Sequence, residues 1–196
     1  MEQIRAFIAV ELPPNAREVL RGIIEDLQVI APEGVRWVKP EGVHLSLKFL
    51  GNIEVECICA IAQVISRCAT WVAPFELSLG ELGAFPDLKA PRAVWLGLAG
   101  ALDGLLDLQR GLEDEIENLG YTRQLRSFNP HLTLGRVRET MPSTQRRGIG
   151  ENLAEVLINM ELELPIKEIS LFQSDLKPSG AMYTRLFSAS LGLLKE

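Results

Sequence analysis

The sequence contains two histidines, and both begin the same tetrapeptide pattern, His-Leu-Ser/Thr-Leu. His44 begins HLSL, and His131 begins HLTL. An imidazole gains or loses a proton close to neutral pH, because its ordinary pKa is about 6.5. Two imidazoles at one centre can therefore act as a general base and a general acid.

Each tetrapeptide is predicted to be a β-strand, in which successive side chains point to opposite faces. His44 and Ser46 then share one face, which Lys48 continues, and His131 and Thr133 share a face of the second strand. Each histidine would lie roughly 6.6 Å from its hydroxyl partner, so a phosphate group could touch both. Two imidazoles on opposite sides, with hydroxyls that donate to charged oxygens, suit an in-line displacement at phosphorus without a metal.

These strands belong to an alternating pattern of strands and helices. Period-two patterns, β-branched residues and short apolar runs predict strands at 4–12, 35–38, 43–50, 75–82, 93–98, 131–137, 161–172 and 181–191. Apolar residues at helical spacing predict helices at 15–30, 55–72, 101–120 and 144–160, the last weakened by Gly148 and Gly150.

The order of these elements indicates an internal duplication. His131 follows His44 by 87 residues, and each histidine is followed by another strand after 30 or 31 residues. We therefore expect an α+β fold of two similar lobes, related by a pseudo-two-fold duplication, each an antiparallel-rich sheet with helices outside. The active-site cleft would lie between the lobes, in a single bilobal domain spanning 1–196 with repeats at roughly 4–90 and 91–190.

Composition narrows the function further. The chain is 47% hydrophobic and has a net charge of −6, which argues against binding along a nucleic-acid duplex but permits a local basic cleft for an RNA end. No apolar run reaches the roughly 18 residues of a membrane span, and residues 1–15 do not suit a signal peptide, so a cytoplasmic protein is expected. Cys57, Cys59 and Cys68 are expected to be free thiols; no metal or other cofactor is predicted, and a monomer is the default expectation.

Several longer stretches resemble one known family. The paired His-x-Ser/Thr-x motifs are similar to those of the 2H phosphoesterase superfamily. RAFIAVELP, VRWVKPEGVHLSLKFLGNI, LGAFPDLKAPRAVWLGL and FNPHLTLGRV resemble, in the same order, blocks of its RNA 2′,3′-cyclic phosphodiesterase (2′-5′ RNA ligase) family. The resemblance extends over nearly the whole chain.

The resemblance implies hydrolysis of an RNA-terminal 2′,3′-cyclic phosphate to a 2′-phosphomonoester. His44 would be the proton donor to the 3′-oxygen, and His131 the proton acceptor that activates water. Ser46 and Thr133 would hold the non-bridging oxygens. A 5′-hydroxyl in place of water would give 2′-5′ ligation. Ser46 stands where threonine is commoner in the family, so the hydroxyl is kept but its rotamer is less restricted.

Three further residues are candidates for substrate binding: Arg136, Lys48 and Trp37. Strand alternation turns Arg136 away from the cleft unless a bulge at Gly135 reverses it. Lys48 has the parity of His44, and Trp37 could stack on a base or belong to the core. Phe7 and Phe49 are expected in the core. Two other functions stay open: a phosphodiesterase for small cyclic-phosphate nucleotides, and a nucleotide- or RNA-binding module without turnover.

Overall fold

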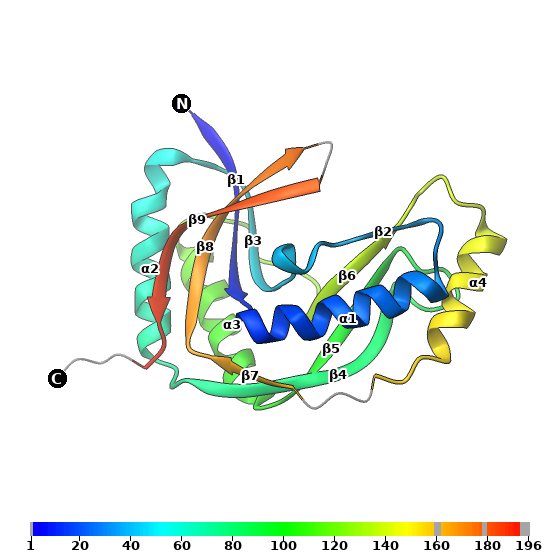
Figure 1. The fold of residues 1–196 in the computed structure, drawn as a ribbon. Coiled ribbons are helices and arrows are strands. Elements are labelled where there is room, and N and C mark those ends of the chain that lie inside the picture. The colour runs from blue at the N-terminus through cyan, green and yellow to red at the C-terminus, as the bar shows by residue number, and fades with distance from the viewer. Residues whose placement is uncertain (1, 159–161, 178–179, 193–196) are drawn as a thin grey trace.

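The strands of the computed structural model, which describes residues 2–158, 162–177 and 180–192, form one antiparallel sheet (Figure 1). The order along the sheet is β7-β4-β5-β6-β3-β1-β8-β9, and β2 pairs separately with β6. The strands are β1 Gln3–Glu11, β2 Val35–Trp37, β3 His44–Glu54, β4 Phe75–Phe85, β5 Ala93–Gly100, β6 His131–Val137, β7 Glu163–Ile166, β8 Glu168–Lys177 and β9 Gly180–Ser190.

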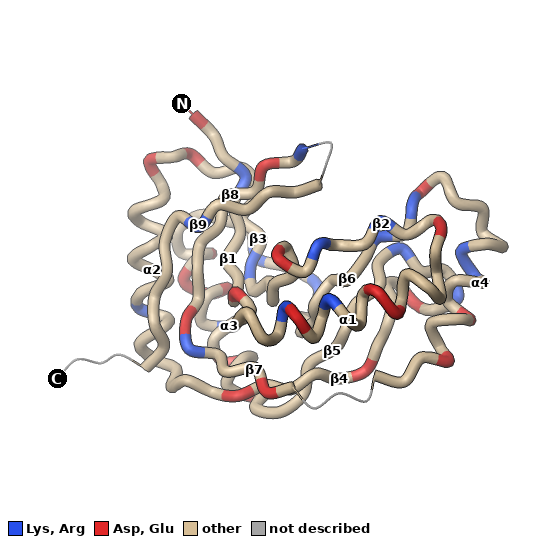
Figure 2. The backbone as a smooth tube through the Cα atoms, viewed as in Figure 1, with Lys and Arg blue, Asp and Glu red and all other residues tan. Residues whose placement is uncertain are grey.

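In the described residues, four α-helices pack against this sheet: α1 Pro14–Ile30, α2 Ile58–Thr70, α3 Leu102–Asn118 and α4 Ser143–Ala154. Single 3₁₀ turns precede β3 and α2, at Pro40–Gly42 and Val55–Cys57. The helices are amphipathic, and α1 begins at a proline, which suits the first turn because its missing N–H has no helical partner. Figure 2 shows acidic and basic residues close together along α1.

The strand order is symmetric about the junction of β3 and β6, the two strands that begin with the histidines. On one side of this junction the sheet continues through β5 to β4, and on the other through β1 to β8. The junction is narrow, because β3 and β6 pair at Leu45 and Leu132 alone. The expected two-lobed α+β architecture is thus confirmed, with both lobes joined in one sheet.

Each lobe takes elements from both halves of the sequence. The strand that ends the first half, β4, lies in the lobe of β5 and β6, whereas β8 from the second half lies beside β1. The helices also pair across the two halves of the sequence. Helix α1 contacts α4, and α2 contacts α3, β8 and β9 (Figure 1). One hydrophobic core therefore runs through the molecule, from Ile8 and Leu20 to Leu132 and Leu171.

Among the predicted elements, two differ most from the structure. The helix predicted over 144–160 ends at Ala154, and residues 159–161 lie outside the described residues. The strand predicted over 161–172 is two strands: β7 pairs with β4, and after Lys167 the chain enters β8, which pairs with β1. A hydrophobic pattern cannot show that a continuous extended segment changes partner.

No helix in the described part of the chain combines the length and the apolar character needed to cross a membrane.

Candidate active site

Each histidine ring is held by a hydrogen bond to a backbone carbonyl oxygen two residues earlier in the chain. Nδ1 of His44 lies 2.9 Å from the carbonyl oxygen of Gly42, and Nδ1 of His131 lies 2.6 Å from that of Asn129. A carbonyl oxygen can only accept, so Nδ1 carries the proton and donates in both rings. Nε2 is therefore the nitrogen that can exchange a proton in each ring.

Both histidines line one cavity of about 500 Å³, and both hydroxyl residues line it with them. The cavity lies over the junction of β3 and β6, which supply His44 and Ser46 on one side and His131 and Thr133 on the other. The alternation predicted for these four residues places them correctly on one face, because Leu45, Leu47, Leu132 and Leu134 are buried in the core.

A β-bulge follows each motif and reverses the alternation. Ser46 pairs with Ala9 but Lys48 pairs with Ile8, so Leu47 is an extra residue in β3. In β6, Thr133 pairs with Trp95 and Gly135 with Val94, so that Leu134 is the extra residue. The two bulges occupy equivalent positions in the two strands, and the residue five places after each histidine consequently turns toward the cavity.

These bulges determine on which face of the sheet the side chains of Arg136, Phe49 and Lys48 lie. Arg136 lines the cavity, because the bulge in β6 turns it toward the side of His131. Phe49 also lines the cavity, so the expectation that it belongs to the core is wrong. The parity assigned to Lys48 is also wrong: its side chain is 0% exposed and lies on the opposite face from His44. Lys48 therefore does not line the cavity that contains the two histidines.

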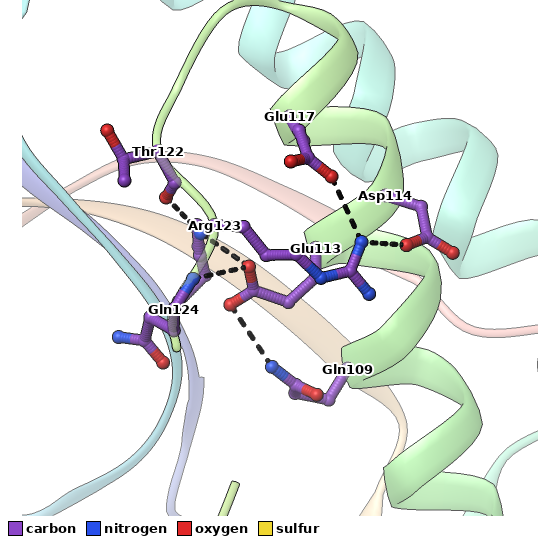
Figure 3. A network of polar contacts seen from close by, with 8 residues as sticks. Gln109, Glu113, Asp114, Glu117, Thr122, Arg123 and Gln124 are labelled. Carbon is purple, nitrogen blue, oxygen red and sulfur yellow. Dashed lines mark hydrogen bonds and ion pairs between the residues drawn. The ribbon is translucent and has the colours of Figure 1, made fainter. Parts of the chain in front are cut away.

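Lys48 instead forms a buried ion pair with a helix. Its Nζ lies 2.6 Å from Oε2 of Glu113 on α3 and donates to the carbonyl oxygen of Thr122 at 2.9 Å. Figure 3 shows Glu113 between Gln109 and the segment from Thr122 to Gln124; its carboxylate accepts from the Gln109 amide and the Gln124 backbone N–H. This network attaches the segment after α3, which leads into His131, to strand β3.

Trp37 is also placed away from the cavity. It pairs with Gly135 on the β2 edge of β6 and packs against the core. A β-carbon at Gly135 would lie 2.8 Å from a ring carbon of Trp37 and 2.7 Å from a methyl carbon of Val35, so glycine permits this close packing. Trp37 lines neither of the cavities that contain His131, which is against a base-stacking role.

Aromatic rings surround each imidazole. His44 lies against Phe7, with ring centres 4.7 Å apart, and against the edge of Tyr183 at 5.0 Å. His131 meets Phe85 edge-on at 4.9 Å and lies 6.2 Å from Trp95. Phe7 is buried as expected, but β9 brings Tyr183 to the cavity from a distant part of the sequence, where no local motif marked it.

Burial lowers the pKa of both histidines. For His44, burial is the main cause, the Gly42 carbonyl opposes it, and the charge of His131 lowers the pKa further. For His131, burial again dominates, the Asn129 carbonyl opposes it, and the Arg136 guanidinium lowers the pKa. Each imidazole is thus biased toward its neutral form at neutral pH, and Arg136 acts directly on His131.

Residues that could hold a metal ion are not gathered in the part of the chain that the structure describes. Within the described ranges, no three His, Cys, Asp or Glu side chains cluster in a way that could hold a metal ion. Cys57, Cys59 and Cys68 are free.

Comparison with known proteins identifies the family. The family described as LigT like Phosphoesterase matches twice, at residues 10–95 and 96–183. The RNA 2′,3′-cyclic phosphodiesterase of Methanothermobacter thermautotrophicus is 35% identical over 93% of this chain and 96% of its own length; that of Thermotoga maritima is 28% identical over 98% and 99%.

Solved structures agree with these sequence relatives. A Thermus thermophilus protein matches with a TM-score of 0.80 at 30% identity, over 96% of this chain and 98% of its own. Escherichia coli LigT complexed with 3′-AMP matches with a TM-score of 0.78 at 27% identity, over 97% and 99%. Two family matches that together span most of the sequence, each containing one histidine motif, show that the chain belongs to the LigT-like phosphoesterases.

Proposed function

We propose that this protein hydrolyses 2′,3′-cyclic phosphates at RNA ends to 2′-phosphomonoesters without a metal ion. The observation that carries the proposal is the pair of imidazoles, each with Nδ1 bonded to a carbonyl and Nε2 free, in one cavity with two hydroxyls. Its relatives named RNA 2′,3′-cyclic phosphodiesterase support the choice of substrate.

Proton transfer and displacement would proceed together. Nε2 of neutral His131 takes a proton from water as the water oxygen bonds to phosphorus. The bond from phosphorus to the 3′-oxygen breaks, and Nε2 of protonated His44 donates its proton to that oxygen. Ser46 and Thr133 donate hydrogen bonds to the non-bridging oxygens, whose charge grows in the transition state. The product keeps the phosphate on the 2′-oxygen, and solvent returns the proton from His131 to His44.

Arg136 favours this direction of transfer over the opposite one. Its guanidinium lowers the pKa of His131 and is not among the causes that shift the pKa of His44. A cation beside His131 disfavours its imidazolium and so favours a neutral base there, while burial lowers the pKa of His44 as well. The anionic phosphate, once bound, would raise the pKa of both rings and help to charge the acid.

The direct test is turnover of nucleoside 2′,3′-cyclic phosphates in the presence and absence of EDTA, with the phosphate position in the product determined by ³¹P NMR. We expect EDTA-insensitive formation of the 2′-phosphate by the natural protein and none above background by His44→Ala or His131→Ala. Arg110→Ala, an exposed substitution on α3 outside the cavity, is the matched control. Loss of activity in EDTA refutes metal independence, and a 3′-phosphate product refutes the direction of cleavage.

A small cyclic-phosphate nucleotide is the second candidate substrate, because a cavity of about 500 Å³ is of the size that holds a single nucleotide. Equal catalytic efficiency on a mononucleotide and on an RNA end would favour it. Binding of either compound without turnover would favour a binding module instead.

The same site would catalyse 2′-5′ ligation if a 5′-hydroxyl took the place of water. Incubation of a cyclic-phosphate-ended oligonucleotide with a 5′-hydroxyl oligonucleotide tests it; a joined product that resists a 3′-5′-specific nuclease is expected. The proposal also includes a cytoplasmic location and a monomeric state, which cell fractionation and light scattering would check.

A further inference from the structure

A second cavity adjoins the catalytic one on the side of His131. It has a volume of about 720 Å³, and it shares Ser46, Phe49, His131 and Arg136 with the first cavity. Its remaining wall comes from the end of β4, the start of β5 and the segment 124–129 that precedes β6. The two cavities therefore adjoin each other at these four residues.

The second cavity is positively charged in a chain of negative net charge. Arg92, Arg126 and Arg136 line it, and none of its lining residues is acidic, although the chain has 26 acidic residues and 20 Lys and Arg. Within the described residues, the side chains of these three arginines form no ion pair or hydrogen bond. In contrast, exposed arginines such as Arg21, Arg67 and Arg147 pair with glutamates. Unpaired guanidinium groups gathered along a cavity suit an anionic ligand.

Aromatic surface accompanies these charges. Phe49, which is 54% exposed, stands where the two cavities meet, and Phe85 and Phe128 line the second one. Stacking of bases on exposed aromatic rings, combined with cations that follow the backbone, is how single-stranded RNA is held.

The wall of this cavity is held in place by the buried network of Figure 3. Glu113 accepts from the backbone N–H of Gln124, and Lys48 donates to the carbonyl oxygen of Thr122, immediately before the segment that carries Arg126 and Phe128. A segment without regular secondary structure is thus attached at its start to a buried ion pair, and at its end to β6. Such attachment reduces the ordering cost of binding.

We propose that the second cavity binds the single-stranded RNA chain adjoining the cyclic phosphate, with Arg92 and Arg126 on its phosphates and Phe49 or Phe128 under its bases. The proposal rests on the proposed function, because it extends that substrate beyond the terminal nucleotide. It implies that the protein selects an RNA end over a free cyclic mononucleotide.

The test compares kcat/KM for a tetranucleotide and for a mononucleotide, both ending in a 2′,3′-cyclic phosphate, in the natural protein and in the Arg92→Ala/Arg126→Ala double variant. We expect the natural protein to prefer the tetranucleotide, and the double variant to lose at least about tenfold of that preference. For the tetranucleotide, the slope of log(kcat/KM) against the logarithm of salt concentration should also become shallower in the variant. The change should be about 0.7 for each RNA phosphate that the variant no longer neutralises. Arg110→Ala should keep both values, and circular dichroism verifies folding of each variant.

The outcomes separate the two proposals. Absence of turnover on both substrates refutes the proposed function. Turnover of the mononucleotide without preference for the tetranucleotide, or with a preference that the double variant retains, refutes the RNA-binding cavity and leaves the proposed function standing. An equal loss on both substrates also refutes it, because the arginines would then serve the terminal nucleotide itself.

Discussion

His44 and His131 are held by equivalent backbones but have different surroundings. Each ring donates from Nδ1 to the carbonyl two residues earlier, and each strand has a bulge after its motif. Beyond the bulge, Lys48 and Phe49 in β3 correspond to Gly135 and Arg136 in β6. The duplicated backbone holds two imidazoles in the same way, and the side chains beside them make their surroundings unequal.

The inequality has a chemical purpose in the proposed mechanism. A donor and an acceptor must hold different protonation states at the same pH, which identical surroundings would not favour. Phe7 and Tyr183 enclose His44, whereas His131 shares its side of the cavity with the Arg136 guanidinium. Aromatic rings lie against both imidazoles, so the cation beside His131 is the difference that would separate the two roles.

Removing either imidazole should have the largest effect. We expect His44→Ala and His131→Ala each to lower kcat/KM about 10³-fold or more, because each removes a proton-transfer group. A substrate with sulfur in place of the 3′-oxygen distinguishes the roles, since a thiolate departs without a proton. His44→Ala should regain much of its rate on this substrate and His131→Ala should not; recovery by His131→Ala would reverse the assignment.

The ion pair at the bulge of β3, which has no counterpart in β6, should matter for stability. Glu113→Gln leaves the Lys48 ammonium buried without a full partner, and we expect it to lower the free energy of unfolding by about 3–5 kcal/mol in urea denaturation. Glu115→Gln, on the same helix but in an exposed pair with Arg67, should cost less than about 1 kcal/mol. Equal costs would show that the buried pair in the network of Figure 3 contributes no more to stability than an exposed pair.

Removal of either hydroxyl should lower the rate by a similar factor, because both would serve the same role. Ser46→Ala and Thr133→Val should each lower kcat about 10²-fold, the usual loss for one donor to a developing charge. Ser46→Thr should stay within about threefold of the natural protein, because the hydroxyl remains. A full rate in either hydroxyl-deleted variant would mean that one wall alone holds the phosphate oxygens.

The smallest effect concerns proton affinity, which NMR titration of the two ring signals can follow. Burial disfavours the charged form of each ring, so both pKa values should lie below about 6.5 in the free protein. Arg136→Ala removes a cation from beside His131 and should raise its pKa more than that of His44. Inorganic phosphate should raise the pKa of both histidines. If the pKa of His131 were unchanged in Arg136→Ala, Arg136 would not explain why the two histidines differ.

Much of the site followed from alternation along two short strands. The alternation correctly grouped His44 with Ser46 and His131 with Thr133, because core leucines fix the opposite face. It was wrong for Lys48 and Phe49, since a bulge is set by the pairing with β1 and has no mark in the apolar pattern of β3. Trp37 could not be placed, because its partner Gly135 lies about a hundred residues away.

The sequence by itself determined the chemistry: two imidazoles, two hydroxyls and a repeated order of elements are written in local residue types and spacing. The tertiary structure decided which elements surround them. β4 and β8 each join the lobe formed by the other half, and β9 brings Tyr183 to His44. Long-range pairing, rather than local propensity, selected these neighbours, and it also gathered Arg92, Arg126 and Arg136 along the second cavity.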